Sequence, residues 1–331
     1  MTPVRPVSAK GSAVRTAPSP SRSVGRDALS WVAFGVAVLA WGVVAWACVT
    51  AWGAIVHGHP AYAIWLGAVG VVAGVAAWWT LGPRRRRHGI APRIGRGVLV
   101  LLALGVVALT AWLRPYTAIE PALAAMGSDA GVTVSESPTE IVLAPATPDT
   151  TALLFRPGAL VDPRAYAAVL RPIAEAGHTV IIVKQPFGLA MLSPGALPAA
   201  RETVAGIDRW IVGGHSLGGT FAAMDADGRD PGVRGLLLFA SYPAGDMSDL
   251  TDLAVASLSG TEDGLATPAK IDASRTNLPD SSAFIVIEGA SHAQFGDYGA
   301  QPGDGTPTLS NDDARRQISD AALAFIDDTA R

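Results

Sequence analysis

The sequence predicts an α/β domain, a mainly parallel sheet with helices on both faces, preceded by three transmembrane helices. Three observations support this fold class. Long uncharged runs fill the first third of the chain, short apolar runs alternate with helical patterns in the rest, and the two parts differ in charge. Residues 1–114 carry twelve Lys and Arg and one acid, whereas residues 115–331 carry thirteen Lys and Arg and twenty-seven acids. A basic apolar segment joined to an acidic one is typical of a membrane-associated chain.

The membrane part is predicted at residues 28–114, after a tail. Residues 1–27 are rich in Pro, Ser and Arg and show no hydrophobic period, which predicts a disordered basic tail. A helix needs ~20 apolar residues to cross a hydrocarbon core. Three runs approach or exceed that length, and the predicted spans cover about 29–56, 61–81 and 97–113. A buried core helix is the alternative, but it suits one run of ~10–14 residues better than three longer ones.

The flanking charges predict the orientation of these spans. Basic residues gather in the tail and in the loop after the second run, which holds Arg84, Arg85, Arg86, Arg87, Arg93 and Arg96. The turn at residues 57–60 has no Lys or Arg. The positive-inside rule therefore places the tail and this loop in the cytoplasm and everything after Arg114 outside. The sequence predicts a multi-pass protein of the cell membrane with an extracytoplasmic domain, and the lipid bilayer as its partner.

Other interpretations of the membrane part fit less well. A cleaved signal peptide is disfavoured because the first run is too long and further runs follow it. A lipoprotein cleavage site before Cys48 lacks the usual aliphatic residue. The arginine cluster could mark a nucleic-acid patch, but between two spans it is a topology signal, so no nucleic-acid partner is predicted. Cys48 is the one cysteine of the chain, which excludes an intrachain disulfide and removes thiol catalysis from the second part.

The second part is expected to comprise a linker at residues 115–138 and a domain at 139–331. Apolar runs rich in β-branched residues predict strands at 141–144, 152–155, 179–184, 210–212, 235–240, 255–258 and 283–287. Helical patterns fall between or after them at 164–176, 189–207, 217–225 and 311–328. Strands that alternate with helices indicate a mainly parallel sheet. Ligands of such sheets bind beyond the carboxyl ends of the strands.

The strongest motif is a Gly-x-Ser-x-Gly segment centred on Ser216. It directly follows the apolar run at 210–212 and directly precedes a helix. In that context the serine occupies a strained turn that projects its hydroxyl above the sheet, while Gly214 and Gly218 allow the turn to close. The amide of Leu217, at the helix N-terminus, is the predicted first donor to an oxyanion. A Gly-Ser turn that merely caps a helix is the alternative.

A serine nucleophile needs a base and an acid that orients the base. His292 is the one histidine after Ser216 and lies just past the last predicted strand, so it is the candidate base. A solvated surface histidine is the alternative for it, and His178, at the start of a strand, is a poor candidate. Asp263 lies in a tight turn after the run at 255–258 and is the candidate acid. Glu262 is the next candidate, with Asp246, Asp249 and Asp252 in the preceding loop, and an Asx turn is the structural alternative for Asp263.

A second oxyanion donor is expected in the loop after the run at 152–155. Pro157 has no amide hydrogen, and Gly158 lets the backbone approach a substrate, so the amide of Ala159 is the candidate. The acidic, glycine-rich segment 294–308 follows the base and is expected to form a wall of the pocket. It has no EF-hand spacing, so no metal is predicted, and nothing in the sequence calls for a cofactor.

These motifs resemble the α/β-hydrolase superfamily. The serine turn, the Gly-Thr-Glu-Asp-Gly turn at 260–264 and the Ser-His-Ala-Gln-Phe-Gly-Asp-Tyr-Gly segment at 291–299 are especially similar to small bacterial membrane-anchored α/β-hydrolases, which are dienelactone-hydrolase-like. The similarity covers about Thr139 to the C-terminus. It implies Ser216 as nucleophile, Asp263 as acid and His292 as base. The chain departs from the pattern at Pro157-Gly158, where many members have His-Gly.

The sequence therefore predicts a membrane-anchored serine hydrolase, carboxylesterase-like, that cleaves an ester-like bond through an acyl-enzyme. Only about twenty residues separate the run at 235–240 from the acid turn, so no large lid is inserted there and a small or membrane-proximal ester is the expected substrate. Two alternatives stay open. The acyl group could pass to an alcohol in an acyltransferase, or the domain could be a catalytically inactive extracytoplasmic binding module.

Overall fold

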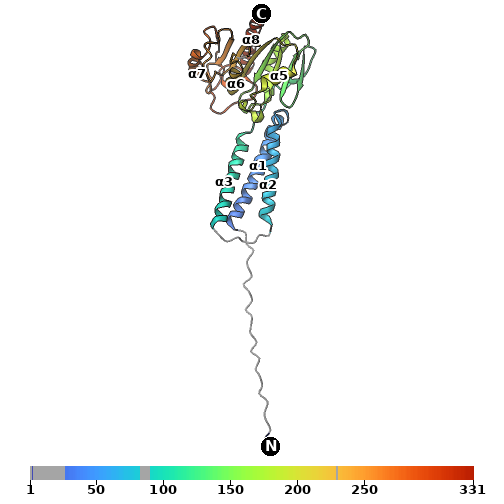
Figure 1. Cartoon of the computed structure of the whole chain (residues 1–331), viewed down its shortest axis with the longest axis vertical. Helices are drawn as coiled ribbons and strands as arrows, with labels where there is room; N and C mark the ends of the chain where they lie inside the picture. The colour runs from blue at the N-terminus through green and yellow to red at the C-terminus, as the bar shows by residue number, and fades with distance from the viewer. Residues whose placement is uncertain (1, 3–26, 83–89, 229) are drawn as a thin grey trace.

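The computed structural model describes residues 2, 27–82, 90–228 and 230–331. Three long helices stand side by side beneath an α/β domain (Figure 1). They are α1 (Ala28–His57), α2 (Pro60–Leu81) and α3 (Ile90–Trp112). All three are long and apolar enough to cross a membrane. The predicted tail lies outside the described residues except for Thr2 and Asp27, and so does the arginine run at 84–87.

The boundaries of these helices have local causes. The Asp27 carboxylate accepts a hydrogen bond from the amide of Ser30 at 2.9 Å and caps α1. Pro60 opens α2 at a position where a missing amide hydrogen costs nothing, after the two-residue turn that reverses the chain. α3 begins at Ile90, seven residues before the predicted span, so Arg93 and Arg96 lie within the helix rather than in the loop before it.

The sheet has eight strands in the order β1-β2-β4-β3-β5-β6-β7-β8. The strands are β1 (Val132–Glu136), β2 (Glu140–Pro145), β3 (Thr151–Arg156), β4 (Thr179–Val183), β5 (Arg209–His215), β6 (Val233–Phe239), β7 (Ala254–Gly260) and β8 (Ala283–Ile287). β1 and β2 are antiparallel to their neighbours, and the other strands are parallel. The predicted mainly parallel sheet is therefore confirmed. β1 lies inside the predicted linker, and Tyr116 also bridges to Val161, so much of that segment is part of the domain.

Helices cover both faces of the sheet. They are α4 (Ala167–Glu175), α5 (Ala196–Thr203), α6 (Leu217–Asp225), α7 (Pro268–Ala273) and α8 (Asn311–Ala330). Short 3₁₀ turns are η1 (Ala124–Met126), η2 (Pro163–Tyr166), η3 (Pro186–Gly188), η4 (Ala190–Leu192), η5 (Ser274–Asn277) and η6 (His292–Phe295). Successive strand residues point to opposite faces, so Leu153 packs in the core that includes residues of α4 and α8, whereas Leu154 packs in the core of α5 and α6.

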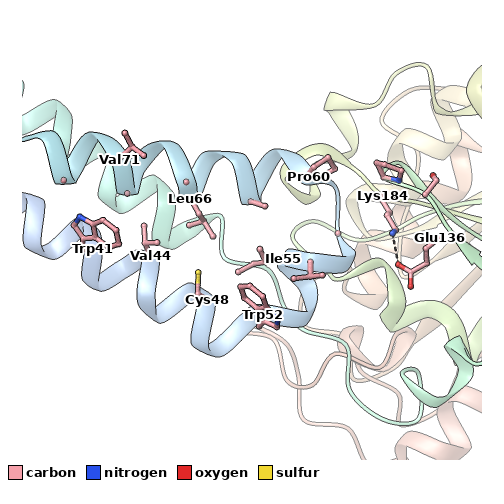
Figure 2. Close-up of a pocket in the computed structure, with 18 of the residues that line it drawn as sticks. Trp41, Val44, Cys48, Trp52, Ile55, Pro60, Leu66, Val71, Glu136 and Lys184 are labelled. Carbon is pink, nitrogen blue, oxygen red and sulfur yellow. Dashed lines mark hydrogen bonds and ion pairs between the residues drawn. The ribbon is translucent and has the colours of Figure 1, made fainter.

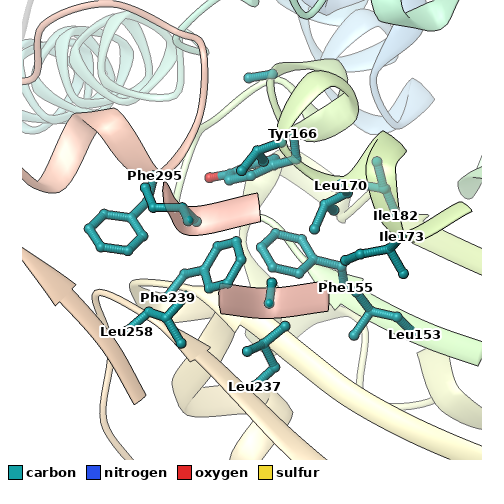
Figure 3. Close-up of a cluster of buried hydrophobic side chains, with 14 of the residues drawn as sticks. Leu153, Phe155, Tyr166, Leu170, Ile173, Ile182, Leu237, Phe239, Leu258 and Phe295 are labelled. Carbon is teal, nitrogen blue, oxygen red and sulfur yellow. The ribbon is translucent and has the colours of Figure 1, made fainter. Parts of the chain in front are cut away.

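An aromatic cluster supports the carboxyl ends of the central strands (Figure 3). Phe155 of β3 lies 5.0 Å from Tyr166 and 5.2 Å from Phe239 of β6, measured between ring centroids. Phe239 in turn lies 5.8 Å from Phe295 of η6. Because these rings are buried and tilted toward one another, they fix the platform on which the loops beyond the strands rest.

The loops after β3 and β4 face the helical bundle. Leu160 packs among side chains of α1 and α2 and against Leu113, and Phe187 and Leu189 join the same apolar cluster. Leu160 has a φ of 61°, which a non-glycine residue rarely adopts. Its amide donates to the Gly188 carbonyl at 2.8 Å and its carbonyl accepts from Tyr116 at 2.7 Å. The carboxyl edge of the sheet is thus directed, at these strands, toward the ends of α1 and α2.

Candidate active site

Ser216 occupies the turn between β5 and α6. Its φ of 52° and ψ of −125° are strained for a residue with a side chain. Its amide donates to Phe239 at 3.0 Å, and its carbonyl accepts from the Ser241 hydroxyl at 2.6 Å. A Cβ at Gly218 would lie 2.1 Å from the Arg156 carbonyl oxygen, so only glycine allows the turn to pass so close to β3. These contacts hold a half-buried serine hydroxyl at the carboxyl edge of the sheet.

The predicted base and acid meet, although 29 residues separate them. His292 Nδ1 lies 2.9 Å from Asp263 Oδ2, and both residues are buried, with exposed fractions of 1% and 3%. The other carboxylate oxygen of Asp263 accepts the amides of Leu265 and Ala266 at 2.8 and 2.7 Å. Asp263 Oδ1 therefore stabilises the turn at residues 263–266, and Oδ2 is left to orient the His292 imidazole.

The second ring nitrogen of His292 is buried and has no hydrogen-bond partner in the described part of the chain. When Nδ1 donates its proton to Asp263, Nε2 carries the lone pair that can accept a proton. No hydrogen bond joins Nε2 to Ser216 within the described residues. Catalytic hydrogen bonds are commonly long without substrate and shorten in the complex, so an open Nε2 is compatible with a general base.

The two predicted oxyanion donors lie on elements that touch. The start of α6 packs against the loop after β3, since a Cβ on Gly218 would also lie 2.3 Å from the Pro157 carbonyl oxygen. Within the described residues, the amides of Leu217 and Ala159 donate to no other group. The Gly158 amide instead donates to the Tyr166 hydroxyl at 2.9 Å. The amide of Ala159 therefore stays available in this loop, and its role as an oxyanion donor remains a prediction.

Tyr166 and His215 form a buried pair that the sequence did not single out. The Tyr166 hydroxyl lies 2.8 Å from His215 Nδ1, and the His215 ring lies 4.5 Å from the His292 ring between centroids. Burial, together with the neighbouring His292, holds the pKa of His215 well below its usual value. Burial therefore favours the neutral form of His215. Its position inside the Gly-x-Ser-x-Gly motif was the available signal, but nothing local identifies Tyr166 as its partner.

Asp304 joins the acid turn to the base loop. One of its oxygens accepts the amides of Gly264 and His292, each at 3.1 Å, and the other accepts Ala293 at 2.8 Å. Burial favours the neutral form, but these amides outweigh it, and the pKa of Asp304 lies below its ordinary value. The sequence marked only the acidic segment 294–308 as a wall of the pocket, and did not assign this role.

The other sequence candidates lie apart from this arrangement. Glu262 has no hydrogen bond to His292 within the described residues; its amide donates to the Ala290 carbonyl instead. Asp246 binds Ser248, and neither Asp249 nor Asp252 pairs with a histidine in the part of the chain that the structure describes. His178 lies between Asp149 and Asp327, with its ring nitrogens 2.7 and 2.9 Å from their carboxylates.

The match to a protein-family model agrees with this fold. The model of the alpha/beta hydrolase family matches residues 152–316. A putative dienelactone hydrolase structure from Klebsiella pneumoniae is 14% identical, with a TM-score of 0.44, covering 60% of this chain and 97% of that one. A dienelactone hydrolase from Anabaena variabilis is 15% identical, with a TM-score of 0.43 and coverages of 59% and 96%. A predicted CIB-like hydrolase from Thermoplasma acidophilum is 13% identical, with a TM-score of 0.46 and coverages of 59% and 100%. No curated protein matches the chain.

Proposed function

Since the chain belongs to the α/β-hydrolase superfamily, we propose that it is a membrane-anchored serine hydrolase that cleaves a carboxylic ester through Ser216, His292 and Asp263. The observation that carries the proposal is the buried His292–Asp263 hydrogen bond of 2.9 Å, which leaves Nε2 of the same imidazole without a partner in the described chain. A buried imidazole with Nδ1 bound to a carboxylate and Nε2 open is the arrangement that a general base requires.

The proposed reaction has two acyl-transfer steps. Ser216 Oγ attacks the ester carbonyl while His292 Nε2 takes the hydroxyl proton, and the proton then passes to the leaving alkoxide as the C–O bond breaks. Asp263 keeps the tautomer with Nδ1 protonated and stabilises the imidazolium. The amides of Leu217 and Ala159 donate to the oxyanion of each tetrahedral intermediate. Water then attacks the acyl-enzyme as it gives a proton to His292 Nε2, and His292 returns that proton to Ser216 Oγ as the Oγ–acyl bond breaks and the acid leaves.

The anchoring proposal rests on α1, α2 and α3, each long and apolar enough to span a bilayer. The distribution of Arg and Lys supports a cytoplasmic tail and an extracytoplasmic hydrolase domain. The proposed site would then lie close to the outer membrane surface, because the loop after β3 packs against the ends of α1 and α2.

The test uses the purified full chain in detergent micelles and a fluorescent fluorophosphonate. We expect labelling and hydrolysis of p-nitrophenyl acetate by the wild type, both lost in Ser216→Ala, with kcat reduced by about 10⁴-fold or more. The matched control is Ser281→Ala at an exposed serine, which should leave both unchanged. A folded wild type that takes no label would overturn the proposal and favour the binding-module alternative. Diversion of the acyl group to an added alcohol would instead identify an acyltransferase.

A further inference from the structure

A long groove runs between α1 and α2 (Figure 2). Its volume is about 960 Å³, and it extends along α1 from Trp41 past Cys48 to Gly58. At 1.5 Å per residue this stretch is roughly 25 Å long, most of a hydrocarbon core of ~30 Å. Except at its domain end, the side chains that line it are almost all apolar. A cavity of this length and chemistry, set in two candidate membrane spans, fits an extended hydrocarbon chain.

Glycines on α2 make the groove hollow. Gly67, Gly70 and Gly74 lie along the face of α2 that lines the cavity, opposite larger side chains of α1. Small residues in membrane helices commonly let two helices pack closely. Here a Cβ at Gly67 would meet no atom within 4 Å, and one at Gly70 would only reach the Trp41 ring at 3.7 Å. Gly67 therefore leaves room in the groove, whereas Gly70 and Gly74 let α2 pack against the Trp41 ring of α1.

Charged side chains close the groove at its domain end. Glu136 and Lys184 line the same cavity, and Lys184 Nζ donates to Glu136 Oε2 at 2.8 Å. His57 Nδ1 lies 3.2 Å from the same carboxylate. Lys184 is buried, and its charge is compensated by the hydrogen-bonded ion pair with Glu136. The groove thus has a long apolar body and one polar end, as a membrane lipid has.

The polar end lies on the same edge of the sheet as Ser216. Ile182 of β4 pairs with Phe155 of β3, which pairs with Gly213 of β5. Lys184 and Ser216 therefore leave the sheet at nearly the same level, two strand spacings or roughly 10 Å apart. A small cavity lies in this area, lined by Gly58, Pro157 and Gln185, and the buried Oε1 of Gln185 has no partner in the described chain.

We propose that the α1–α2 groove binds one acyl chain of a membrane lipid, and that the ester cleaved at Ser216 belongs to that lipid. The acyl chain lies along Gly67 and Gly70 and leaves the groove past Glu136 and Lys184, and the ester lies farther along the sheet edge, at Ser216. This inference rests on the proposed function and adds the substrate class. It also gives the membrane helices a second role, since they supply the acyl-binding site as well as the anchor.

The test fills the groove without touching the catalytic groups. Gly67→Phe adds a ring where a Cβ meets nothing, and Gly42→Phe is the matched control, because Gly42 is exposed on α1 and does not line the cavity. Hydrolysis of p-nitrophenyl palmitate and p-nitrophenyl acetate is measured in mixed micelles. We expect Gly67→Phe to lower kcat/KM for palmitate by about tenfold or more and to leave acetate within about twofold. Gly42→Phe should leave both unchanged. An equal loss on both esters, or no loss on palmitate, would overturn the proposal.

A second measurement does not depend on turnover. Ser216→Ala protein in lipid nanodiscs is irradiated with phosphatidylethanolamine that carries a diazirine in its acyl chain. We expect crosslinks concentrated on the groove faces of α1 and α2 and lost in Gly67→Phe. Crosslinks that spread equally over α1, α2 and α3 and do not change in Gly67→Phe would show ordinary lipid contact and overturn the proposal. A change in oligomeric mass, showing that a second copy fills the groove, would also overturn it. If the wild type hydrolyses neither ester and takes no fluorophosphonate, the proposed function fails, and the crosslinks still decide whether the groove binds lipid.

Discussion

The Tyr166 hydroxyl lies 2.8 Å from His215 Nδ1 and accepts the amide of Gly158 at 2.9 Å. The phenol thus bonds to both the Gly158 amide and His215 Nδ1, so one hydroxyl ties the loop after β3 to the residue next to Ser216. The proposed donor Ala159 directly follows Gly158. The pair therefore sets the distance between the two amides that are proposed to bind the oxyanion.

Tyr166→Phe should weaken catalysis more than binding. The change leaves the Gly158 amide and His215 Nδ1 buried without a partner, at a cost of about 1–3 kcal/mol for an unpaired group. We expect kcat for p-nitrophenyl acetate to fall about tenfold while KM changes little. Tyr242→Phe, at a half-buried tyrosine whose hydroxyl bonds to no described residue, is the control. Equal kcat values for Tyr166→Phe and wild type would show that the pair does not position the loop.

His215 should make the folded state sensitive to acid. Its folded pKa lies well below 6.5 because of burial and of His292, so below pH 6.5 the unfolded chain binds a proton there that the folded chain does not. Stability therefore falls as the pH drops below 6.5, by at most about 1.4 kcal/mol per pH unit for this group. His215→Gln should flatten this dependence, as measured by urea unfolding followed by circular dichroism at pH 5, 6 and 7. Parallel pH dependences for the two proteins would contradict the prediction.

Asp304 should act by holding the base loop. In Asp304→Asn, an amide nitrogen replaces one of the two oxygens that accept backbone amides, so at least one of those bonds is lost. A charge-assisted hydrogen bond contributes about 1.5–3 kcal/mol, and we expect kcat to fall about 10- to 100-fold with little change in KM. Glu288→Gln, at an exposed acid, is the control. Unchanged kcat in Asp304→Asn would show that the clamp is not needed.

The choice between the two acids of the turn can be decided by paired substitutions. Asp263→Asn keeps the shape of the turn but should favour the wrong tautomer of His292, with kcat reduced by about 10⁴-fold. Glu262→Gln should leave kcat within about twofold, since no hydrogen bond joins Glu262 to His292 in the described chain. The reverse order of effects would transfer the acid role to Glu262.

The proposed topology can be tested by thiol labelling of intact cells. Cys48→Ala removes the one cysteine, after which Pro302→Cys places a thiol at an exposed site of the hydrolase domain and Ser8→Cys places one in the tail. A membrane-impermeant maleimide should label Pro302→Cys and not Ser8→Cys. Labelling of Ser8→Cys alone would invert the orientation.

Most of the fold follows from local patterns. The central strands are continuous apolar runs, and the helices between them have apolar faces, so the sequence predicts both the elements and the parallel sheet. β1 was not predicted because it is an edge strand of five residues with a largely exposed face, and its pairing with β2 compensates for a weak local signal. α3 begins seven residues before the predicted start of its span. The prediction placed that start after Arg96, but Arg93 and Arg96 are themselves part of the helix.

The candidate site is predictable to the extent that its signals are local. Ser216 is marked by its glycines, and Asp263 and His292 by their positions after strands. Tyr166 and Asp304 were not identified, because their contacts reach 49 and 40 residues along the chain, to His215 and Gly264, and only the folded sheet edge brings them together.

Leu160 shows that the two parts of this chain cannot be exchanged as separate modules. It is one residue beyond the proposed oxyanion amide of Ala159, yet its side chain packs among α1, α2 and Leu113. A chimera that joined the domain to a foreign anchor at Arg114 would expose this leucine and lose the support of its left-handed backbone. A chimera with a foreign helical bundle would also need new residues at Leu160, Phe187 and Leu189, which pack against that bundle. Substitutions on the two sides of this contact must therefore be compatible with each other.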